Sequence, residues 1–289
     1  MYVAAASRAL RPVLARPARP AELLGLSRGA LYLRTAGQPG VLVVLCHDAV
    51  RLPCGLVLPA TSAEQPLTSL VTQPAGSSAG FAVGDGVVSW TGPDGLVVVR
   101  AVREWAPPRP GQGRVAASAL AAVRPLLADA VLADAGLRGG DPGIDSRVLA
   151  GLADAARDYD ASAAVAAHLL GRGSGLTPSG DDVLAGFLVG AAAFGLDVAA
   201  LRAVIDVLAP ARTTALSAAL LWHAGRGECI DELAAVAEVL RSPGPGEPGQ
   251  AAGAVSRLLS VGHTSGAALA LGLVLAAEAA QQAARERAA

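Results

Sequence analysis

Glycine, hydroxyl and carboxylate side chains gather in one stretch of the chain, Gly171-Arg-Gly-Ser-Gly-Leu-Thr-Pro-Ser-Gly-Asp-Asp182. Glycines at alternate positions let backbone N–H groups face a ligand without interference from Cβ atoms. An apolar helix is expected to begin directly after them, and a helix N-terminus attracts anions through its unpaired N–H groups and its dipole. A capped turn without a ligand is the structural alternative. The residues expected to bind a small anion here are Arg172, Gly173, Gly175, Thr177, Ser179, Gly180 and Asp182.

The two carboxylates that end this stretch have different explanations. If Ser179 is the N-cap, Asp182 stands at N3 and completes an acidic variant of the capping box. If Thr177 is the N-cap, Pro178 takes N1, where proline is favoured. Both carboxylates also lie in line with apolar residues of the expected helix, and a buried carboxylate needs a partner or a function. We expect Asp181 to be catalytic, as a general base, a metal ligand or an acceptor for a substrate N–H.

A second stretch, Gly262-His-Thr-Ser-Gly266, opens the last long helix in the same way. Thr264 or Ser265 can cap that helix, and an anion can dock at its N-terminus. His263 stands just outside the helix and is the imidazole best placed for proton transfer or for holding an oxyanion. We expect His263 to be the second catalytic residue, with a purely structural histidine beside a cap as the alternative.

A third cluster of hydroxyl groups lies in Arg212-Thr-Thr-Ala-Leu-Ser217. Thr213 and Ser217 are four residues apart and share a helix face, with Thr214 beside them, which indicates a polar lining for a ligand. Hydrogen bonds from these hydroxyls back to carbonyl groups of their own helix are the alternative. Arg212, expected at the helix start, could bind a carboxylate or a phosphate through two parallel hydrogen bonds, or could lie solvated at the surface.

The elements that position these residues are helices, which we expect throughout a domain of residues 111–289. The apolar periodicity predicts helices over Val115–Ala135, Ser146–Ala156, Ala161–Leu170, Asp181–Phe194, Val198–Leu208, Thr213–Ala224, Ile230–Leu240, Ala251–Leu259 and Ser265–Arg285. No strand precedes the glycine loop, which excludes a dinucleotide-binding fingerprint. Ser242–Gln250, rich in Pro and Gly, is expected to be a flexible connector.

Residues 1–110 are expected to form a β-rich domain, ending at the Pro- and Gly-rich segment Pro107–Gly113. Turn signals separate short aliphatic runs that predict strands over Ala30–Thr35, Val41–Cys46, Gly55–Leu58, Gly86–Trp90 and Leu96–Val102. The first twenty residues carry four arginines and no acid, and we expect them to be a basic, frayed N-terminus. The fold class is therefore α+β: a small N-terminal β barrel or sandwich followed by a mostly helical domain.

The amino-acid composition excludes several classes of function and indicates the cellular compartment. The formal net charge of −1 argues against nucleic-acid binding, and the absence of lysine excludes a Schiff base or a phosphate-loop lysine. The apolar run Val183–Leu196 is too short to cross a bilayer, so no membrane association is expected. Cys46, Cys54 and Cys229 are odd in number and lack metal-ligand spacing, which favours a reducing cytoplasm. Cys46-His47-Asp48 does not predict a nucleophile, because three adjacent side chains on a strand end cannot all converge.

Taken together, the motifs at Gly171–Asp182, Thr213–Ser217 and Gly262–Gly266 resemble a bacterial family long catalogued as a domain of unknown function. That family includes the smallest of three subunits of the oxamate carbamoyltransferase of anaerobic allantoin breakdown. The resemblance covers the helical half, whereas the β half matches only in general character. The family usually has an apolar residue and a proline where this chain has Arg172 and Ser174, a departure that could alter the ligand.

The resemblance implies a complex that transfers a carbamoyl group between oxamate or oxalurate and phosphate or carbamoyl phosphate. Its partner subunits resemble acyl-CoA-synthetase relatives. We therefore expect a carbamoyltransferase subunit that binds a small anion and needs no cofactor. A non-catalytic, anion-binding regulatory subunit is the first alternative. A phosphoryl-transfer enzyme that holds magnesium at Asp181 and Asp182 is the second.

Overall fold

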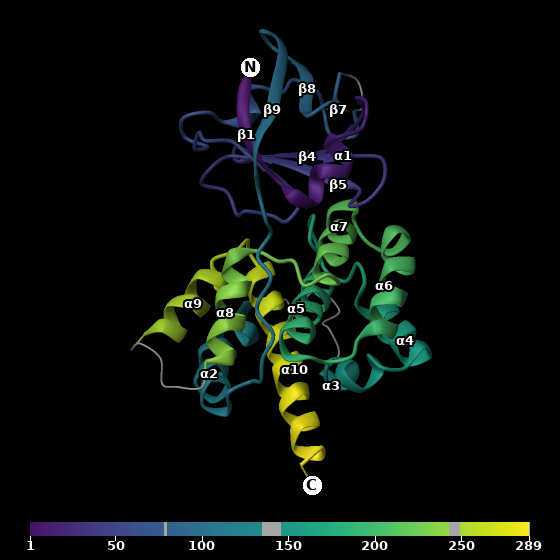
Figure 1. Cartoon of the computed structure of the whole chain (residues 1–289), viewed down its shortest axis with the longest axis vertical. Coiled ribbons are helices and arrows are strands. Elements are labelled where there is room, and N and C mark those ends of the chain that lie inside the picture. Colours follow the sequence, from purple (N-terminus) through teal and green to yellow (C-terminus); the bar gives the residue numbers. More distant parts are fainter. Residues whose placement is uncertain (78–79, 135–145, 243–248, 289) are drawn as a thin grey trace. The chain divides into compact units, whose positions relative to one another are not determined.

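The computed structural model describes residues 1–77, 80–134, 146–242 and 249–288 (Figure 1). The chain divides into two compact units, Met1–Pro107 and Pro108–Ala289. The first unit is built mainly of strands and the second of helices, which confirms the α+β class.

The described part of the first unit contains a nine-stranded sheet in the order β2-β7-β8-β9-β1-β6-β5-β4-β3. The edge strands β2 and β3 follow each other in the chain, separated by Ala21. The amide of Ala21 donates to the carbonyl of Phe81 at 3.1 Å, so the sheet curls into a nearly closed barrel. The strands are β1 (Tyr2–Ser7), β2 (Arg19–Pro20), β3 (Glu22–Leu26), β4 (Ala30–Arg34), β5 (Val41–Leu45), β6 (Gly55–Val57), β7 (Ala82–Gly84), β8 (Val87–Gly92) and β9 (Gly95–Trp105).

All five strands expected from β-branched and aliphatic runs are present as β4, β5, β6, β8 and β9. The expectation of a frayed N-terminus is wrong, because β1 pairs in parallel with β9 and antiparallel with β6. Alanine has a low strand propensity, so the Ala-rich β1 carries little local signal. Ala4 and Ala6 are nevertheless buried in the barrel, and pairing on both sides overrides the weak propensity.

The described helices of the second unit each correspond to an expected one. They are α2 (Ala117–Asp134), α3 (Ser146–Ala155), α4 (Tyr159–Leu169), α5 (Ser179–Phe194), α6 (Ala199–Arg212), α7 (Ala215–Ala224), α8 (Asp231–Arg241), α9 (Gln250–Leu259) and α10 (Ser265–Glu286). The short α-helix α1 (Arg11–Leu14) belongs to the β unit, as do the 3-10 helices Arg8–Leu10 and Leu67–Ser69. The expected connector Ser242–Gln250 lies largely outside the described residues, since 243–248 are not among them.

The pair α5 and α10 forms the centre of the helical unit (Figure 1). Glycines bring the two backbones into direct contact: a Cβ on Gly186 would overlap the carbonyl oxygen of Leu269, and one on Gly272 would overlap that of Val183. Among the described helices, α10 alone is long and apolar enough to cross a membrane by length and composition. Just over half of its apolar window is buried inside the protein, as is typical of a core helix.

The segment that leads into α2 is tied to the helices it precedes. Its backbone hydrogen bonds join Cys229 N to Pro108 O, Gly113 N to Ala193 O and Ala116 N to Leu240 O. Glu228 adds a side-chain anchor, accepting from Arg109 at 2.5 Å and contacting Nδ1 of the fully buried His223 at 2.7 Å. Burial alone would raise the pKa of Glu228, but these partners hold it below its ordinary value. The segment is therefore an integral part of the helical unit.

Candidate functional site

The three sequence motifs meet at the N-termini of α5, α7 and α10. The hydroxyl oxygens of Thr177 and Ser265 lie 2.9 Å apart, and Ser179 donates to Thr264 at 3.3 Å. From the third motif, the Thr214 hydroxyl donates to the carbonyl of Leu176 at 2.6 Å. We call the region formed by Gly171–Asp182, Thr213–Ser217 and Gly262–Gly266 the glycine-loop site.

The glycine loop has a backbone conformation that only glycine adopts without strain. Gly171, Gly173 and Gly175 have φ values of +73°, +115° and +87°. A Cβ on Gly173 would also lie 2.7 Å from the amide nitrogen of Ser179, so the loop folds tightly onto the start of α5. Within the described residues, a run of backbone amides here donates to no protein acceptor: those of Gly173, Ser174, Gly175, Leu176, Thr177 and Ser179. Such a group of free amides is what an anion requires.

Asp181 holds this loop in place. One carboxylate oxygen accepts from the amide of Gly171 at 2.9 Å, and the other accepts from the Thr213 hydroxyl. Burial raises the pKa of Asp181, and hydrogen bonds from Thr213, Gly171 and Ser217 offset part of that rise. Because its side chain is only 2% exposed and both oxygens are engaged, Asp181 links the loop, α5 and the start of α7.

Asp182 has a different environment, although it is the next residue. It is 5% exposed and hydrogen-bonded to Ser265, yet its Oδ2 atom has no hydrogen-bond partner among the described residues. Burial raises its pKa to about 8, and the charge of Asp181 adds to that effect. Asp182 therefore carries its proton at neutral pH.

Neither capping interpretation of this helix is correct. The N-cap of α5 is Pro178, which offers no side-chain hydrogen bond, and its carbonyl accepts from the amides of both Asp181 and Asp182. The hydroxyls of Thr177 and Ser179 bond instead to hydroxyls at the start of α10. The tertiary contact has displaced the local cap, so capping does not account for Asp182.

The start of α10 also lacks a side-chain cap. Thr264 occupies the N-cap position of α10, as one of the two expectations had it, but its side chain makes no capping hydrogen bond. The start of α7 differs: there Thr214 is a true cap, accepting from the amide of Ser217 at 3.0 Å. The Ser217 hydroxyl also reaches the Leu176 carbonyl, at 3.5 Å.

The basic residues of the motifs lie at the periphery. His263 is exposed and makes no hydrogen bond or ion pair within the described part of the chain. Arg212 is exposed and is the last residue of α6, so its expected place at a helix start is wrong. Arg172 is half-buried, and its backbone carbonyl accepts from Gly180, where a Cβ would overlap the carbonyl of Leu169. Gly180 is therefore a packing requirement of the loop.

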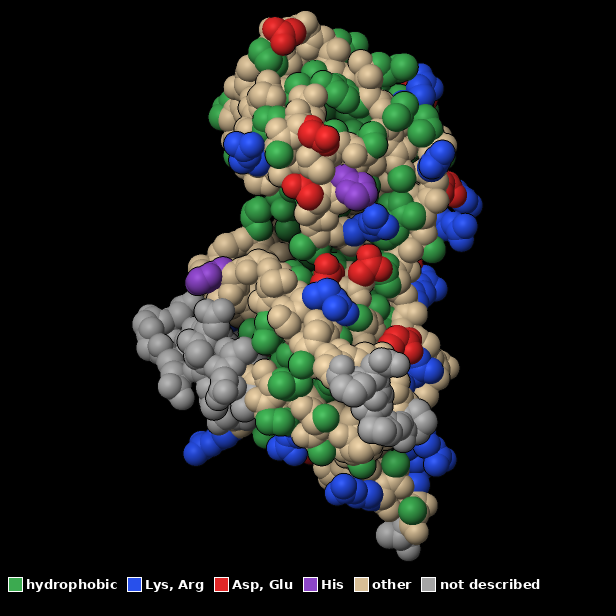
Figure 2. Space-filling view, turned by 90° about the vertical axis from the view of Figure 1, so that its left-hand side faces the viewer, with side chains coloured by type: hydrophobic (Ala, Val, Ile, Leu, Met, Phe, Trp, Pro, Cys, Tyr) green, Lys and Arg blue, Asp and Glu red, His purple; other side chains and the backbone are tan. Residues whose placement is uncertain are grey.

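No group of three metal-ligating side chains that could hold a metal ion is found among the described residues. Figure 2 shows acidic and basic side chains interspersed over the described part of the face it presents, without a continuous basic stripe. Interspersed charge agrees with the formal net charge of −1.

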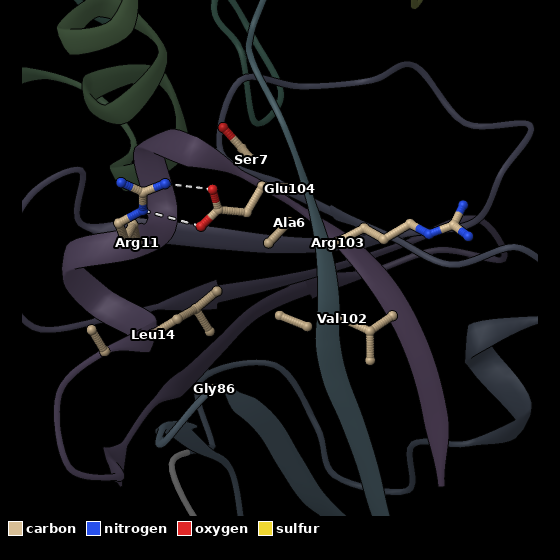
Figure 3. A pocket seen from close by; sticks show the side chains of 10 residues that line it. Ala6, Ser7, Arg11, Leu14, Gly86, Val102, Arg103 and Glu104 are labelled. Carbon is tan, nitrogen blue, oxygen red and sulfur yellow. Dashed lines mark hydrogen bonds and ion pairs between the residues drawn. The ribbon is translucent and has the colours of Figure 1, made fainter.

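A separate shallow groove of about 550 Å³ lies in the β unit, beside α1, β1 and β9 (Figure 3). An exposed ion pair joins Arg11 to Glu104 at 2.5 Å, and Arg103 extends away from it. The hydrogen bond from Arg11 lowers the pKa of Glu104. The lining includes no histidine or cysteine, and its carboxylate, Glu104, is already paired with Arg11.

Comparisons with known proteins were made for the whole chain and concern its sequence family and its fold. No solved structure matches the chain. Residues 169–277 match the family model described as oxamate carbamoyltransferase subunit AllH. The match runs from the end of α4 into α10 and contains all three motifs of the site. Residues 169–277 of the helical unit are thus similar to the oxamate carbamoyltransferase subunit family, in agreement with the resemblance of the motifs.

Proposed function

We propose that this chain is a subunit of an oxamate carbamoyltransferase and binds a small oxyanion at the glycine-loop site. The observation that supports it is the group of free backbone amides at the point where the N-termini of α5, α7 and α10 meet. Three helix dipoles with their positive ends at one place favour negative charge, and amides donate to it directly. Phosphate, carbamoyl phosphate and oxamate all carry such an oxyanion.

In the proposed reaction, the amide nitrogen of oxamate attacks the carbamoyl carbon of carbamoyl phosphate. The bond from that carbon to the phosphate oxygen breaks, the nitrogen loses a proton, and oxalurate and phosphate are the products. The reverse reaction transfers the carbamoyl group back to phosphate. The chain's own contribution is to hold and orient one of these anions, with Arg172 near the loop and His263 as the candidate for proton transfer.

Other subunits of the complex are expected partners, and the cytoplasm is the proposed compartment. The function as proposed needs no cofactor. Magnesium bound between Asp181 and Asp182 is disfavoured, because both oxygens of Asp181 already accept hydrogen bonds from the protein.

Ligand binding tests the site directly. Oxamate, phosphate and carbamoyl phosphate are added separately to the purified chain, and its melting temperature is measured. We expect at least one of these anions to raise it, because a ligand that binds only the folded state stabilises that state. Oxamide, the neutral analogue of oxamate, serves as the control and should give no rise. If none of the anions raises the melting temperature, the site does not bind them.

Turnover is measured in a second step as phosphate release from carbamoyl phosphate and oxamate. Activity of the chain alone would show that it carries the catalytic groups. Activity that appears only when the partner subunits are added would show that the chain contributes binding or assembly to a shared active site.

A further inference from the structure

The two adjacent carboxyl groups of the glycine-loop site are not equivalent. Asp181 uses both oxygens to hold the loop and the start of α7. Asp182 uses one side of its carboxyl group for the Ser265 hydroxyl, and its Oδ2 atom is left without a partner. A buried polar atom without a partner costs free energy, and native proteins keep few of them. The open position on Asp182 therefore needs an explanation.

The location of Asp182 supplies one. Ser265, its hydrogen-bond partner, also contacts Thr177 of the loop, so Asp182 lies where the starts of α5 and α10 meet. The free amides of the loop belong to the residues directly before it, from Gly173 to Ser179. Two independent features, unpaired donors and an unpaired carboxyl oxygen, are thus both found at the start of α5.

We propose that Asp182 binds the ligand as a neutral carboxylic acid, donating its proton in a hydrogen bond to an oxygen of the bound oxyanion, while Asp181 is a positioning residue that does not touch the ligand. The inference rests on the proposed function, because it takes the oxyanion site as given. An ionised Asp182 would repel the ligand, whereas the acid form adds a donor to the free amides of the loop.

The surroundings of Asp182 favour the acid form. Its own helix supplies one charge, that of Asp181, which opposes a second negative charge beside it. The hydroxyls of Thr213 and Ser217 bond to Asp181, and that of Ser265 on α10 bonds to Asp182. The loop hydroxyl of Thr177 contacts Ser265 in turn. The nearby basic residues of the motifs, Arg172, Arg212 and His263, make no ion pair with it among the described residues.

Binding of oxamate at two pH values tests the proposal, because the oxamate carboxylate stays ionised throughout. Since Asp182 has a pKa of about 8 in the free protein, the affinity measured by calorimetry should fall about tenfold from about pH 7 to about pH 9. Asp182→Asn keeps an N–H donor and has no proton to lose. Its affinity near pH 7 should stay within a fewfold of the wild type, and its pH dependence should disappear. His263→Gln should keep the pH dependence.

A measurement on the wild-type chain alone covers the case in which the variant does not fold. Calorimetry in buffers of different ionisation enthalpy gives the number of protons taken up with the ligand. We expect about one proton per oxamate near pH 9 and about a tenth of one near pH 7. Inorganic phosphate, tested near pH 7, distinguishes a general oxyanion site from one that requires a carboxylate.

The outcomes separate the two proposals. If neither oxamate nor phosphate binds at any pH, the proposed function fails and the inference fails with it. If oxamate binds with the same affinity at both pH values and takes up no proton, the proposed function stands and the role of Asp182 is refuted. Loss of oxamate binding in Asp182→Asn near pH 7, with an unchanged melting temperature, would also refute a role as a neutral donor.

Discussion

Replacing Asp182 with Asn should change how the stability of the helical unit depends on pH. The folded protein holds the Asp182 proton up to about pH 8, whereas the ordinary aspartate pKa of 3.8 applies to the unfolded chain. Between these values the folded state binds more protons, so the free energy of unfolding falls as the pH rises and levels off above about pH 8. Each pH unit in that window costs about 1.4 kcal/mol. The full cost of ionising Asp182 is then about 6 kcal/mol.

Asn cannot ionise and avoids this cost. The difference in unfolding free energy between variant and wild type should grow in favour of the variant by about 4 kcal/mol from about pH 4 to about pH 7. This difference is measured by urea denaturation at a series of pH values. Unfolding is monitored by far-UV circular dichroism, whose signal comes mainly from the helices α2–α10. Titrating groups that do not interact with Asp182 contribute equally to both proteins and cancel in the difference, whereas Asp181, which is coupled to it, does not cancel fully. Parallel stability curves for the two proteins would refute the burial and protonation of Asp182.

Three further substitutions test the architecture of the site. Gly173→Ala should abolish the anion-induced rise in melting temperature and cost about 1–3 kcal/mol, because φ is +115° and a Cβ would collide with the start of α5. Thr213→Val removes a donor to the buried Asp181 carboxylate and should cost about 1–3 kcal/mol in urea denaturation. Gly186→Ala should cost about 3 kcal/mol or prevent folding, since its Cβ would overlap the Leu269 carbonyl on α10.

Matched controls show whether these effects are specific. Gly253→Ala lies within α9, where a Cβ has room, and should be neutral or slightly stabilising. Thr213→Ser retains the hydroxyl and should keep most of the stability that Thr213→Val loses. An unchanged melting temperature and anion response in Gly173→Ala would contradict the strained geometry of the loop. A fully stable Gly186→Ala would contradict backbone contact between α5 and α10.

The local pattern of apolar residues was sufficient to predict the helices and strands that have a clear periodicity or a run of β-branched and aliphatic residues. The helices of the second unit follow the apolar periodicity, and β5 is a Val- and Leu-only run buried at every position. Strands β1, β3 and β7 escaped prediction because they contain Ala, Leu and Gly rather than runs of β-branched residues. Strand β1 also pairs only with β6 and β9, which are distant in sequence and lie outside any local window, whereas β3 and β7 pair with the next strand along the chain.

The site shows the same limit at the level of single atoms. Sequence spacing identified both carboxyl groups and the hydroxyls around them, and it offered both capping and ligand binding for Asp182. The difference between the two acids depends on contacts from outside α5. The Thr213 hydroxyl bonds to the carboxylate of Asp181, whereas the Ser265 hydroxyl leaves one oxygen of Asp182 without a partner. Which of two adjacent acids keeps an open oxygen is a property of the tertiary structure. No periodicity in the sequence encodes it.

The glycine contacts between α5 and α10 have a consequence for how such a site can diversify. Because backbone touches backbone at Gly186 and Gly272, the spacing of the two helix starts does not depend on side chains that could be exchanged. Ser174 is exposed and Arg172 is only half-buried in the loop that precedes α5. A change of ligand can therefore evolve in the loop at little risk to the scaffold, whereas any change at the two glycines puts the whole fold at risk.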